Sequence, residues 1–369
     1  MSNTQKKNVP ELRFPGFEGE WEEKKLEDII KVNSGKDYKH LDKGDIPVYG
    51  TGGFMTSVSE PLSEIDAVGI GRKGTINKPY LLEAPFWTAD TLFYCTPKKE
   101  TDILFILSLF RKINWKVYDE STGVPSLSKQ TINKINRFVP TNKEQQKIGK
   151  FFSKLDRQIE LEEQKLELLQ QQKKCYMQKI FSQELRFKDE NGNDYPEWEE
   201  KMIKDVYEIT RGLVLSKKLI SKKTNDVNKY PVYSSQTTNN GLMGYYSNYL
   251  YKDSITWTTD GANAGSVSYR SGKFYCTNVC GVLINEKGNS NLCMSEMLNR
   301  IAFKHVSKVG NPKLMNNVMA MVKLNFPCIE EQLKIARFIE AVEKNIVNQE
   351  RKIDLLKQVK NGLLQKMFI

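Results

Sequence analysis

Residues 143–181 read KEQQKIGKFFSKLDRQIELEEQKLELLQQQKKCYMQKIF, and the pattern of this stretch returns at residues 330–368, at a constant offset of 187 residues. In both copies apolar residues recur in alternating steps of four and three, which is the spacing of a coiled-coil seam. These residues are Ile148, Phe152, Leu155, Ile159, Leu166, Leu169, Tyr176 and Ile180, matched by Ile335, Ile339, Val342, Ile346, Ile353, Leu356, Leu363 and Met367. Neither copy contains proline, and the residues between are mostly Glu, Gln, Lys and Arg, which favour helix. We therefore predict two long helices, over residues 143–183 and 330–369.

Each predicted helix needs a partner, and the other copy can supply it. At 1.5 Å per residue such a helix is about 58 Å long, and its narrow apolar stripe cannot stabilise it alone. Because a whole domain separates the copies, the second helix can return alongside the first as an antiparallel coiled coil within one chain. Glu162 and Gln349, and again Lys173 and Lys360, interrupt the two seams at matching positions. Polar seam residues usually set the register at some cost in stability.

The remainder of the chain repeats as well, which indicates a tandem duplication. The sequence ELRF occurs at residues 11–14 and returns at residues 184–187, and a tryptophan follows each copy. Between each ELRF and the next long helix lie short runs of β-branched and aromatic residues punctuated by glycine, which predict strands and turns. We expect one α+β domain over residues 1–142 and a second over residues 184–329.

Within the two domains several segments correspond. The predicted strands 46–50 and 230–234 match, as do the strand–turn–strand segments 67–76 and 254–266, and the predicted helices 102–115 and 290–305. Further along, we align the sequence Phe-Trp-Thr at residues 86–88 with Tyr-Cys-Thr at residues 275–277. Outside this framework the domains have diverged, as expected if each recognises something different.

The net charge of +11 is unevenly distributed along the chain. Residues 211–329 contain 15 Lys+Arg against 5 Asp+Glu, whereas residues 31–142 contain 15 against 12. A basic segment of this kind can meet a polyanion such as nucleic acid, and a generally basic surface is the alternative. No apolar run approaches the roughly 18 residues of a membrane span and the start of the chain has no signal-peptide core, so we expect no membrane partner and a cytoplasmic protein.

Residues for catalysis or for holding a cofactor are hard to find. The six cysteines show no disulfide spacing, which suits a reducing cytoplasm. Cys276 and Cys280 are a weak indication of a metal, but with only His40 and His305 in the chain we expect buried thiols and no metal site. Since the chain also lacks a G-x-x-x-x-G-K-[ST] loop and an amino-methyltransferase tetrapeptide, we expect no catalytic residues and no cofactor in this chain.

Gly69, Gly71 and Gly74 spell G-x-G-x-x-G, which in other contexts cradles a dinucleotide. A dinucleotide fingerprint must open a helix, whereas this one continues into a proline-containing segment, and the second domain lacks the pattern. We predict instead a β-turn that carries Arg72 and Lys73 towards a ligand.

Polar, aromatic and basic residues gather at the predicted turns of both domains. Arg and Lys suit guanine edges and phosphates, and Asn and Gln suit adenine, so the set fits DNA read from loops. For any single residue, an ordinary surface turn is the alternative. The candidate DNA-binding residues are Lys36, Tyr38, Tyr49, Arg72, Lys73, Trp87 and Thr88 in the first domain and Ser235, Gln236, Asn239, Asn263, Arg270, Tyr275, Lys308 and Lys313 in the second.

Two local motifs carry a family resemblance. Residues 121–128 read STGVPSLS, and a P-x-x-x-E-Q sequence that begins at Pro140 leads into the first long helix. In the second half, residues 308–314, KVGNPKL, keep the Gly, Pro and Leu but lose the Thr, and P-x-x-x-E-Q returns at Pro327. Together with the ELRF openings, this pattern resembles the specificity subunits of type I restriction-modification systems over nearly the whole sequence.

The resemblance implies two target-recognition domains separated by two long antiparallel helices, which form an intramolecular coiled coil with a pseudo-twofold repeat. It implies a non-catalytic chain that binds double-stranded DNA and two methyltransferase subunits, which use S-adenosylmethionine to modify adenine. Restriction subunits that use ATP and Mg²⁺ can join this complex. Each domain would read one half of a bipartite site, and the helices would hold the halves apart.

The outer faces of the helices are the expected surface for the methyltransferase subunits, with plain solvation of these faces as the alternative. The candidate partner-binding residues are Arg157, Gln158, Glu163 and Lys165 and their repeats Lys344, Asn345, Glu350 and Lys352.

Two other functions stay open at this point. The chain could be a coiled-coil scaffold whose two domains bind proteins, or an enzyme with an unrecognised site. Salt-sensitive, sequence-selective DNA binding would separate the DNA reader from the scaffold. Methylation by the isolated chain would favour the enzyme.

Overall fold

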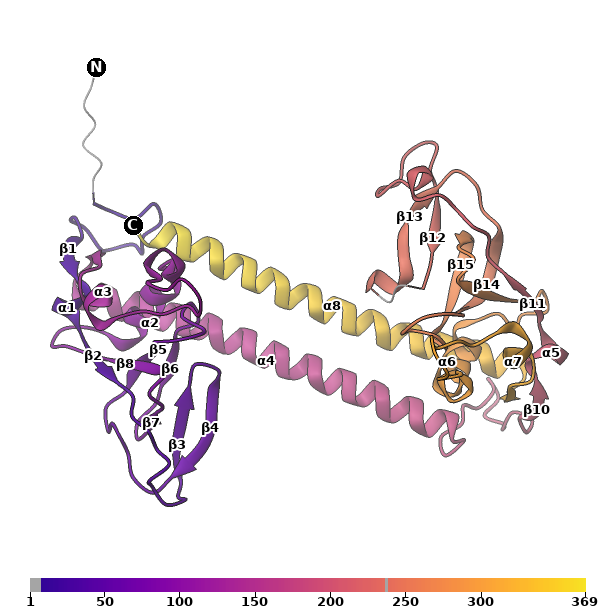
Figure 1. Cartoon of the computed structure of the whole chain (residues 1–369), viewed down its shortest axis with the longest axis horizontal. Coiled ribbons are helices and arrows are strands. Elements are labelled where there is room, and N and C mark those ends of the chain that lie inside the picture. Colours follow the sequence, from indigo (N-terminus) through magenta and orange to yellow (C-terminus); the bar gives the residue numbers. More distant parts are fainter. Residues whose placement is uncertain (1–7, 236–237) are drawn as a thin grey trace. The chain divides into compact units, whose positions relative to one another are not determined.

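The computed structural model describes residues 8–235 and 238–369, and the chain divides into two compact units (Figure 1). Unit 1 comprises the described residues up to Lys165 together with Gln349–Ile369, and unit 2 is Leu166–Asn348. Each unit contains one globular domain and one end of each long helix.

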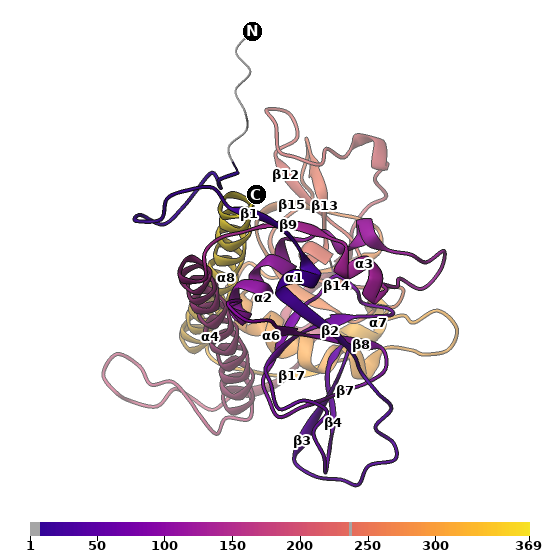
Figure 2. The same ribbon diagram turned by 90° about the vertical axis from the view of Figure 1, so that its left-hand side faces the viewer.

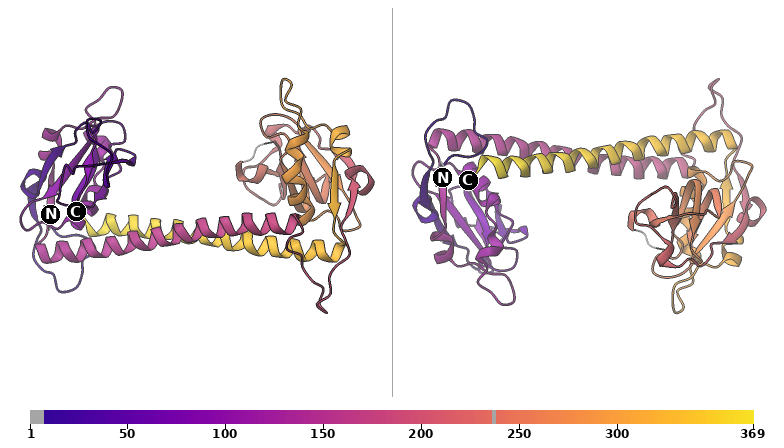
Figure 3. Two further views of the ribbon diagram at one scale, coloured as in Figure 1. Left: turned by 90° about the horizontal axis from the view of Figure 1, so that it is seen from below. Right: turned by 90° about the horizontal axis from the view of Figure 1, so that it is seen from above.

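The two long helices are α4 (Asn142–Phe181) and α8 (Ile329–Met367), as the repeat predicts. Figures 1 and 3 show that they run side by side in opposite directions. In unit 1 the first half of α4 lies against the second half of α8, and in unit 2 the remaining halves pair. The predicted antiparallel coiled coil is confirmed. Within the described part of the chain, no helix combines the length and the apolar character needed to cross a membrane.

Glu162 and Gln349, the polar seam residues at the same position of the two repeats, contact each other. Gln349 Nε2 donates to Glu162 Oε2 at 2.7 Å and to the Glu162 carbonyl oxygen at 2.9 Å. Lys352 Nζ donates to the other carboxylate oxygen at 2.5 Å. Hydrogen bonds from Gln349 and then from Lys352 lower the pKa of Glu162. A one-turn slip of either helix would break all of these bonds, so they define the register of the pair.

The second pair of polar seam residues forms salt bridges across the helices. Lys173 Nζ lies 2.8 Å from Glu343 in unit 2, and Lys360 bridges to Asp156 in unit 1. The offset of 187 residues converts the first bridge into the second. Equivalent residues of the two repeats therefore make equivalent contacts in the two units.

One predicted seam residue is wrong. Tyr176 is 42% exposed, whereas Met177 is only 5% exposed, as is its repeat Leu364. The buried positions therefore step by four, not three, after Lys173 and Lys360. The reason is that each helix end faces a globular domain, so Met177 enters the core of unit 2 and Leu364 the core of unit 1.

The domain of unit 1 contains a two-stranded, a four-stranded and a three-stranded sheet, in the orders β1-β9, β2-β8-β5-β6 and β4-β3-β7. The four-stranded sheet is antiparallel throughout, and β3 pairs with β7 in parallel. In Figure 2, where unit 1 faces the viewer, the β3–β4 hairpin lies at the opposite end of the domain from β1. The elements are β1 (Glu22–Lys25), α1 (Leu26–Ile29), β2 (Ile30–Ser34), β3 (Ile46–Gly50), β4 (Gly53–Val58), β5 (Ala67–Gly71), β6 (Tyr80–Leu82), β7 (Trp87–Thr88), β8 (Leu92–Pro97), α2 (Ile103–Lys112), η1 (Trp115–Tyr118), α3 (Lys129–Asn133) and β9 (Asn136–Val139).

The domain of unit 2 repeats this plan with one change. Its main sheet has six strands, in the order β11-β16-β14-β15-β12-β13, beside the pair β10-β17. The long strand β15 pairs with β14 as β6 pairs with β5, and with β12 as β7 pairs with β3. One strand therefore joins what are separate four-stranded and three-stranded sheets in unit 1. The elements are β10 (Glu199–Met202), α5 (Ile203–Val206), β11 (Glu208–Arg211), η2 (Lys217–Leu219), β12 (Tyr230–Tyr233), η3 (Thr238–Gly241), β13 (Leu242–Tyr246), β14 (Tyr251–Thr258), β15 (Val267–Cys276), β16 (Cys280–Ile284), α6 (Leu292–Ala302), η4 (Phe303–His305), α7 (Asn316–Ala320) and β17 (Lys323–Phe326).

Strand register corrects one alignment between the domains. Val48 pairs with Trp87 and Val232 pairs with Tyr275, both in parallel. Trp87 is thus the equivalent of Tyr275, and the prediction that placed Phe86 opposite Tyr275 is wrong by one residue. Two neighbouring aromatic residues in unit 1 left the match ambiguous in sequence, and only the strand pairing resolves it.

Each domain shares its core with the ends of both long helices. In unit 1 the core includes Ile148 and Phe152 from α4, and Phe368, just beyond α8, stacks on Phe105 of α2 with ring centroids 5.5 Å apart. In unit 2 the core includes Ile180 of α4 and residues from the start of α8. Burial of apolar surface therefore makes each domain continuous with the helix pair.

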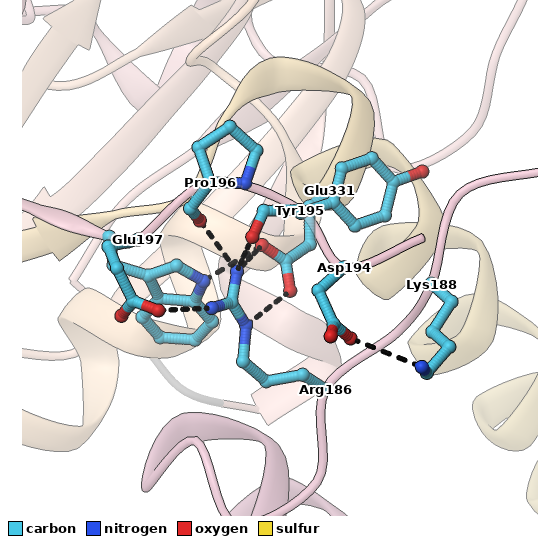
Figure 4. A network of polar contacts seen from close by, with 8 residues as sticks. Arg186, Lys188, Asp194, Tyr195, Pro196, Glu197 and Glu331 are labelled. Carbon is cyan, nitrogen blue, oxygen red and sulfur yellow. Dashed lines mark hydrogen bonds and ion pairs between the residues drawn. The ribbon is translucent and has the colours of Figure 1, made fainter. Parts of the chain in front are cut away.

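A buried carboxylate, that of Glu331 on α8, anchors the opening segment of unit 2 (Figure 4). Glu331 is fully buried and accepts hydrogen bonds from Arg186 Nε at 3.2 Å, Arg186 Nη2 at 2.9 Å and Trp198 Nε1 at 2.9 Å. Arg186 also donates to the carbonyl oxygens of Tyr195 and Pro196. Arginine–carboxylate pairs with two parallel bonds are among the strong hydrogen bonds of proteins. Since Arg186 belongs to ELRF and Glu331 to P-x-x-x-E-Q, the two repeated motifs are partners.

Unit 1 makes the same junction. Arg13 of the first ELRF donates to Glu144 through Nε at 2.8 Å and Nη2 at 2.7 Å. The backbone N–H of Leu12 donates to the carbonyl oxygen of Lys366 at 2.9 Å, which also ties this opening to the end of α8. Trp21, the equivalent of Trp198, has a buried Nε1 with no hydrogen-bond partner among the described residues.

The glutamine of each P-x-x-x-E-Q motif extends the junction to the domain helix. Gln145 Nε2 donates to the carbonyl oxygen of Pro140 at 2.9 Å, and its Oε1 accepts from the N–H of Asp102, the residue that caps α2. Gln332 Oε1 accepts instead from the side-chain amide of Asn291, the residue that caps α6, at 2.7 Å. The motif therefore fixes the angle at which each long helix leaves its domain.

We expect Arg186→Ala to destabilise unit 2, because it leaves the carboxylate of Glu331 buried with only an indole N–H as partner. Breaking a buried ion pair on one side costs about 3 kcal/mol or more. Chemical denaturation followed by circular dichroism measures the loss. The matched control is Lys323→Ala, whose exposed bridge to Glu200 is worth less than about 1 kcal/mol. Equal effects of the two variants would contradict the anchoring role.

Candidate nucleic-acid interface

A tight turn in unit 1 presents Arg72 and Lys73. At Gly71, the last residue of β5, a Cβ atom would lie 2.1 Å from the carbonyl oxygen of Thr75, so only glycine permits this approach. Gly69 lies inside the same strand, and no helix follows the turn. The G-x-G-x-x-G sequence therefore forms a sharp bend at Arg72 and Lys73 and is not a dinucleotide fingerprint.

Backbone hydrogen bonds clamp this turn on both sides. The N–H of Arg72 donates to Thr91 at 2.8 Å, and the carbonyl oxygen of Arg72 accepts from Leu127 at 2.9 Å. The N–H of Gly74 donates to Pro125 at 2.8 Å. Since Pro125 and Leu127 belong to the STGVPSLS segment, residues 121–128, this motif holds the turn that carries the exposed side chain of Arg72.

Further predicted residues of unit 1 converge on the segment next to this turn. The N–H of Lys36 donates to Thr88 at 2.9 Å, and the N–H of Ala89 donates to Tyr49 at 2.8 Å. Lys36 is exposed, and the ring of Tyr49 packs on that of Tyr80. These contacts bring Lys36 and Tyr49 to residues 87–91, the segment that also accepts the hydrogen bond from the N–H of Arg72.

Three predicted residues of unit 1 are more enclosed. Trp87 is 6% exposed and donates from Nε1 to the carbonyl oxygen of Lys36 at 3.0 Å. Thr88 is buried, and Tyr38 packs against the cluster that Trp87 forms with Val48. These side chains therefore support the exposed loops from the interior of the domain.

Unit 2 makes equivalent backbone hydrogen bonds around residues 259–261. We call this set of bonds, around residues 72–74 in unit 1 and 259–261 in unit 2, the frame. The N–H of Gly261 donates to Pro312 at 2.9 Å, the N–H of Leu314 to Thr259 at 2.8 Å, and the N–H of Thr259 to Val279 at 3.0 Å. Each bond has its counterpart around Arg72 in unit 1. The altered KVGNPKL segment therefore keeps the backbone contacts of the motif although it has lost the threonine.

The side chains on this common frame differ in kind. Thr259 and Asp260 occupy the positions of Arg72 and Lys73, and Arg211 Nη2 donates to them at 3.1 and 3.2 Å. A cationic turn in unit 1 is thus an ion-paired turn in unit 2. Because base edges are distinguished by the donors and acceptors offered to them, the two turns present different recognition chemistry. Arg211 and Asp260 are not among the residues predicted from sequence, because their pairing spans 49 positions of the chain.

Arg270, a predicted contact, lies inside unit 2. It is 7% exposed, and its guanidinium lies 3.9 Å from the centroid of the Tyr233 ring. Its Nε donates to Thr256 Oγ1 at 3.1 Å and its Nη1 to the carbonyl oxygen of Asn240 at 2.7 Å. Burial lowers the pKa of Arg270. A polar cavity of about 220 Å³ adjoins the guanidinium.

The bond to Asn240 fixes an unusual turn. Asn239 and Asn240 both have φ of 52°, a left-handed conformation that is uncommon for residues with a side chain and best tolerated by asparagine. Asn239 is exposed on this turn. Arg270 therefore acts on the predicted contact Asn239 through the backbone next to it.

The other predicted residues of unit 2 lie close to the same frame or on exposed loops. Asn263 Nδ2 donates to the carbonyl oxygen of Ser235 at 3.2 Å, which joins two loops. Tyr275 is buried against Tyr246, whereas Lys308 and Lys313 are exposed. Gln236 lies outside the described residues.

All eight candidate partner-binding residues lie on the exposed faces of the long helices. Glu163 makes a salt bridge to Lys357 at 2.6 Å, and Arg157 one to Glu160 at 2.8 Å. Exposed apolar side chains lie on the same helices, among them Leu168 and its repeat Leu355. The remaining candidates are Gln158, Lys165, Lys344, Asn345, Glu350 and Lys352.

Cys276 and Cys280 are free thiols inside unit 2. Burial raises the pKa of Cys280 to about 11 and that of Cys276 further. Across residues 8–235 and 238–369, no three His, Cys, Asp or Glu side chains come together as metal ligands.

A family of known proteins matches this chain twice, once over each domain. The family described as type I restriction modification DNA specificity domain matches residues 18–171 and, a second time, residues 195–358. The chain belongs to this family. The two matches correspond to the two domains with their helices, and the description assigns DNA specificity to such a domain.

Relatives of the specificity chain occur in Mycoplasma pneumoniae. S.MpnORF365P, named as a type I specificity subunit, is 36% identical over 231 residues, which cover 60% of this chain and 80% of the relative. The type I restriction enzyme MpnII specificity subunit is 41% identical over 147 residues, which cover 38% of this chain and 43% of the relative. S.MpnORF507P is likewise matched over 43% of its length, so the chain spans under half of some curated relatives.

Solved structures show the same fold as the specificity chain. The S subunit of a type I restriction-modification system from M. genitalium superposes with a TM-score of 0.71 at 14% identity, covering 98% of this chain and 99% of that one. A chain from a study of complex assembly and conformational transition of the type I R-M system gives 0.54 at 12% identity, covering 94% and 97%.

For the specificity chain, we expect Arg270→Leu to weaken sequence discrimination by unit 2 by about 1–3 kcal/mol, because the turn at Asn239 loses its anchor. Salt dependence of DNA binding should stay unchanged, since the guanidinium is buried and its hydrogen bonds go to Thr256 and Asn240. Binding to duplexes with single base changes, measured at several salt concentrations, tests this.

Arg72→Gln in unit 1 is the matched control for this variant, and its effect should fall on the other part of the recognised sequence. If Arg270→Leu instead flattened the salt dependence by about one unit and left discrimination intact, Arg270 would be a phosphate contact.

Proposed function

We propose that the chain is the sequence reader of a type I restriction-modification complex and recognises a bipartite, asymmetric sequence in double-stranded DNA. The observation that carries this proposal is the common backbone frame of the two domains with different side chains at equivalent positions. In this proposal the two equivalent sets of backbone bonds support two reading surfaces in one chain, and unlike side chains, such as Arg72 against Thr259, give them different targets. An interrupted site with two unrelated halves follows.

Charge and side-chain type support DNA as the ligand. The exposed Arg72, Lys73 and Lys36 in unit 1, and Lys308 and Lys313 in unit 2, suit phosphates and guanine edges. Asn239 and Asn263 suit adenine. Basic residues at turns clamped by backbone hydrogen bonds are held in place before DNA arrives, which reduces the entropic cost of binding.

The chemistry belongs to partner subunits in this proposal. Two methyltransferase subunits, carrying S-adenosylmethionine, modify adenine in the two halves of the site, and restriction subunits that use ATP and Mg²⁺ cut unmodified DNA. This chain supplies neither cofactor nor catalytic group, and directs both activities to the sequence that it binds.

The outer faces of α4 and α8 are the proposed docking surface for the methyltransferase subunits. Leu168 and Leu355 are exposed at the same position of the two repeats, which offers each of two identical partners an equivalent apolar contact. Exposed charged residues such as Arg157 and Lys344 lie on the same helices. The two helices, continuous from one unit to the other, are proposed to set the unread gap between the half-sites.

A base-resolved map of adenine methylation tests this function. Cells would express a cognate methyltransferase subunit with and without the specificity chain. We expect a new motif of two defined parts with a fixed gap, present only when the chain is made. Association of both proteins without any new motif would contradict the DNA-reading function and favour a protein-binding scaffold.

A further inference from the structure

The connection that joins β2 to β3 in unit 1 and β11 to β12 in unit 2 differs sharply between the two domains. In unit 1 residues 35–45 join β2 to β3 and contain three lysines and three aspartates. In unit 2 residues 212–229 join the equivalent strands β11 and β12 and contain five lysines and one aspartate. We call residues 212–229 the strap. The topologically equivalent connection is therefore longer in unit 2 and strongly cationic, whereas that of unit 1 is neutral.

The strap starts inside the frame that carries the candidate DNA contacts. At its first residue, Gly212, a Cβ atom would lie 2.2 Å from the carbonyl oxygen of Thr277, so glycine is required there. The N–H of Leu213 then donates to Cys276 at 3.2 Å, the counterpart of the bond from Lys36 to Thr88 in unit 1. The strap thus leaves the frame at the position where unit 1 places Lys36.

Beyond this point the strap lies on the outer edge of the six-stranded sheet. Ser221 exchanges two backbone hydrogen bonds with Tyr245 of the edge strand β13, at 2.9 and 2.8 Å. Gly244 permits the approach, because a Cβ atom there would lie 2.3 Å from the Ser221 carbonyl oxygen. The path of the strap is therefore fixed by backbone contacts at both Gly212 and Ser221.

Two copies of the tripeptide Ser-Lys-Lys, at residues 216–218 and 221–223, follow this path. Their four lysines are exposed, and none makes an ion pair within the described part of the chain. Neighbouring like charges repel one another, so this arrangement costs stability unless a polyanion neutralises it. Local bonds, such as that from Ser221 Oγ to the carbonyl oxygen of Lys223 at 2.6 Å, shape the second copy.

We propose that the strap is the phosphate-binding element of unit 2 and gives this unit the larger share of sequence-independent affinity for double-stranded DNA. Lysines suit this task because the ammonium group binds phosphate as a point charge without reading bases. Unit 1 instead carries its cations at the clamped turn. The proposal rests on the proposed function, and it predicts that unit 2 contributes more of the sequence-independent affinity than unit 1, while both units discriminate between sequences.

The test substitutes Lys217, Lys218, Lys222 and Lys223 by Gln in the full chain. Binding to a duplex of arbitrary sequence is measured by fluorescence anisotropy between about 50 and 300 mM KCl. Each lost phosphate contact should reduce the slope of log K against log salt concentration by about 0.9, so we expect a slope shallower by about 2 to 4 and an affinity about 100-fold or more lower near 100 mM salt.

Two further variants make the result specific. Substituting the same four lysines by Arg keeps the charge and should preserve the slope. Substituting Lys174, Lys204, Lys287 and Lys304 by Gln removes equal charge from exposed positions elsewhere in unit 2 and should change the slope by less than about one unit. Thermal melting of all variants checks that the strap substitutions leave the fold intact.

The outcomes separate the strap from the proposed function. If the unchanged chain binds DNA and the strap variant keeps its slope, the strap proposal is overturned and the proposed function stands. A strap variant that keeps its slope but no longer associates with the methyltransferase subunit would make the strap a protein-docking surface. If the unchanged chain shows no salt-dependent DNA binding at all, the proposed function itself fails.

Discussion

The hydrogen bonds between Gln349 and Glu162 are the constraint on which the arrangement of this chain depends. Apolar residues in steps of three and four make the helices associate, but they would permit several registers. The amide and the carboxylate satisfy each other in one register only, at 2.7 Å. Since the two residues occupy the same position of the repeat, their contact also makes the helix pair repeat itself, and the bridges Lys173–Glu343 and Lys360–Asp156 follow from it.

A second set of buried polar contacts attaches each domain to the helices. Glu144 and Glu331 stand at the starts of α4 and α8, and each is bound by the arginine of an ELRF segment. An unpaired buried carboxylate is costly, so each domain is stable only when the arginine of its ELRF segment pairs with the glutamate at the start of the long helix. The domains can diverge in their turns because this junction and the clamped frame are independent of the side chains exposed on them.

Much of the fold could be predicted from periodicity. The steps of Ile148, Phe152 and Leu155, and their repetition after 187 residues, were sufficient for the long helices and their pairing. Tyr176 was mispredicted because the heptad rule assumes that only a helix covers the seam, whereas a domain core covers it there. The partnership of Arg186 with Glu331 could not be predicted, since it joins residues 145 apart through tertiary packing.

The candidate site was less accessible to sequence reasoning. Residue type indicates what Arg270 can bind, but its burial depends on Thr256 and Asn240, which only folding brings to it. Arg211 and Asp260 were missed for the same reason. The turn at Arg72 was predictable, because glycines with cations between them and no helix afterwards leave few conformations.

The most direct test of the account exchanges one reading domain for the other. Residues 15–139 would replace residues 188–326, between the shared ELRF segment and the proline of P-x-x-x-E-Q, and adenine methylation would be mapped in cells with the methyltransferase subunit. If the helix pair repeats about Glu162 and Gln349, the recognised sequence becomes an inverted repeat of the half read by unit 1, with the gap unchanged. An unaltered asymmetric motif, or a changed gap, would contradict the account.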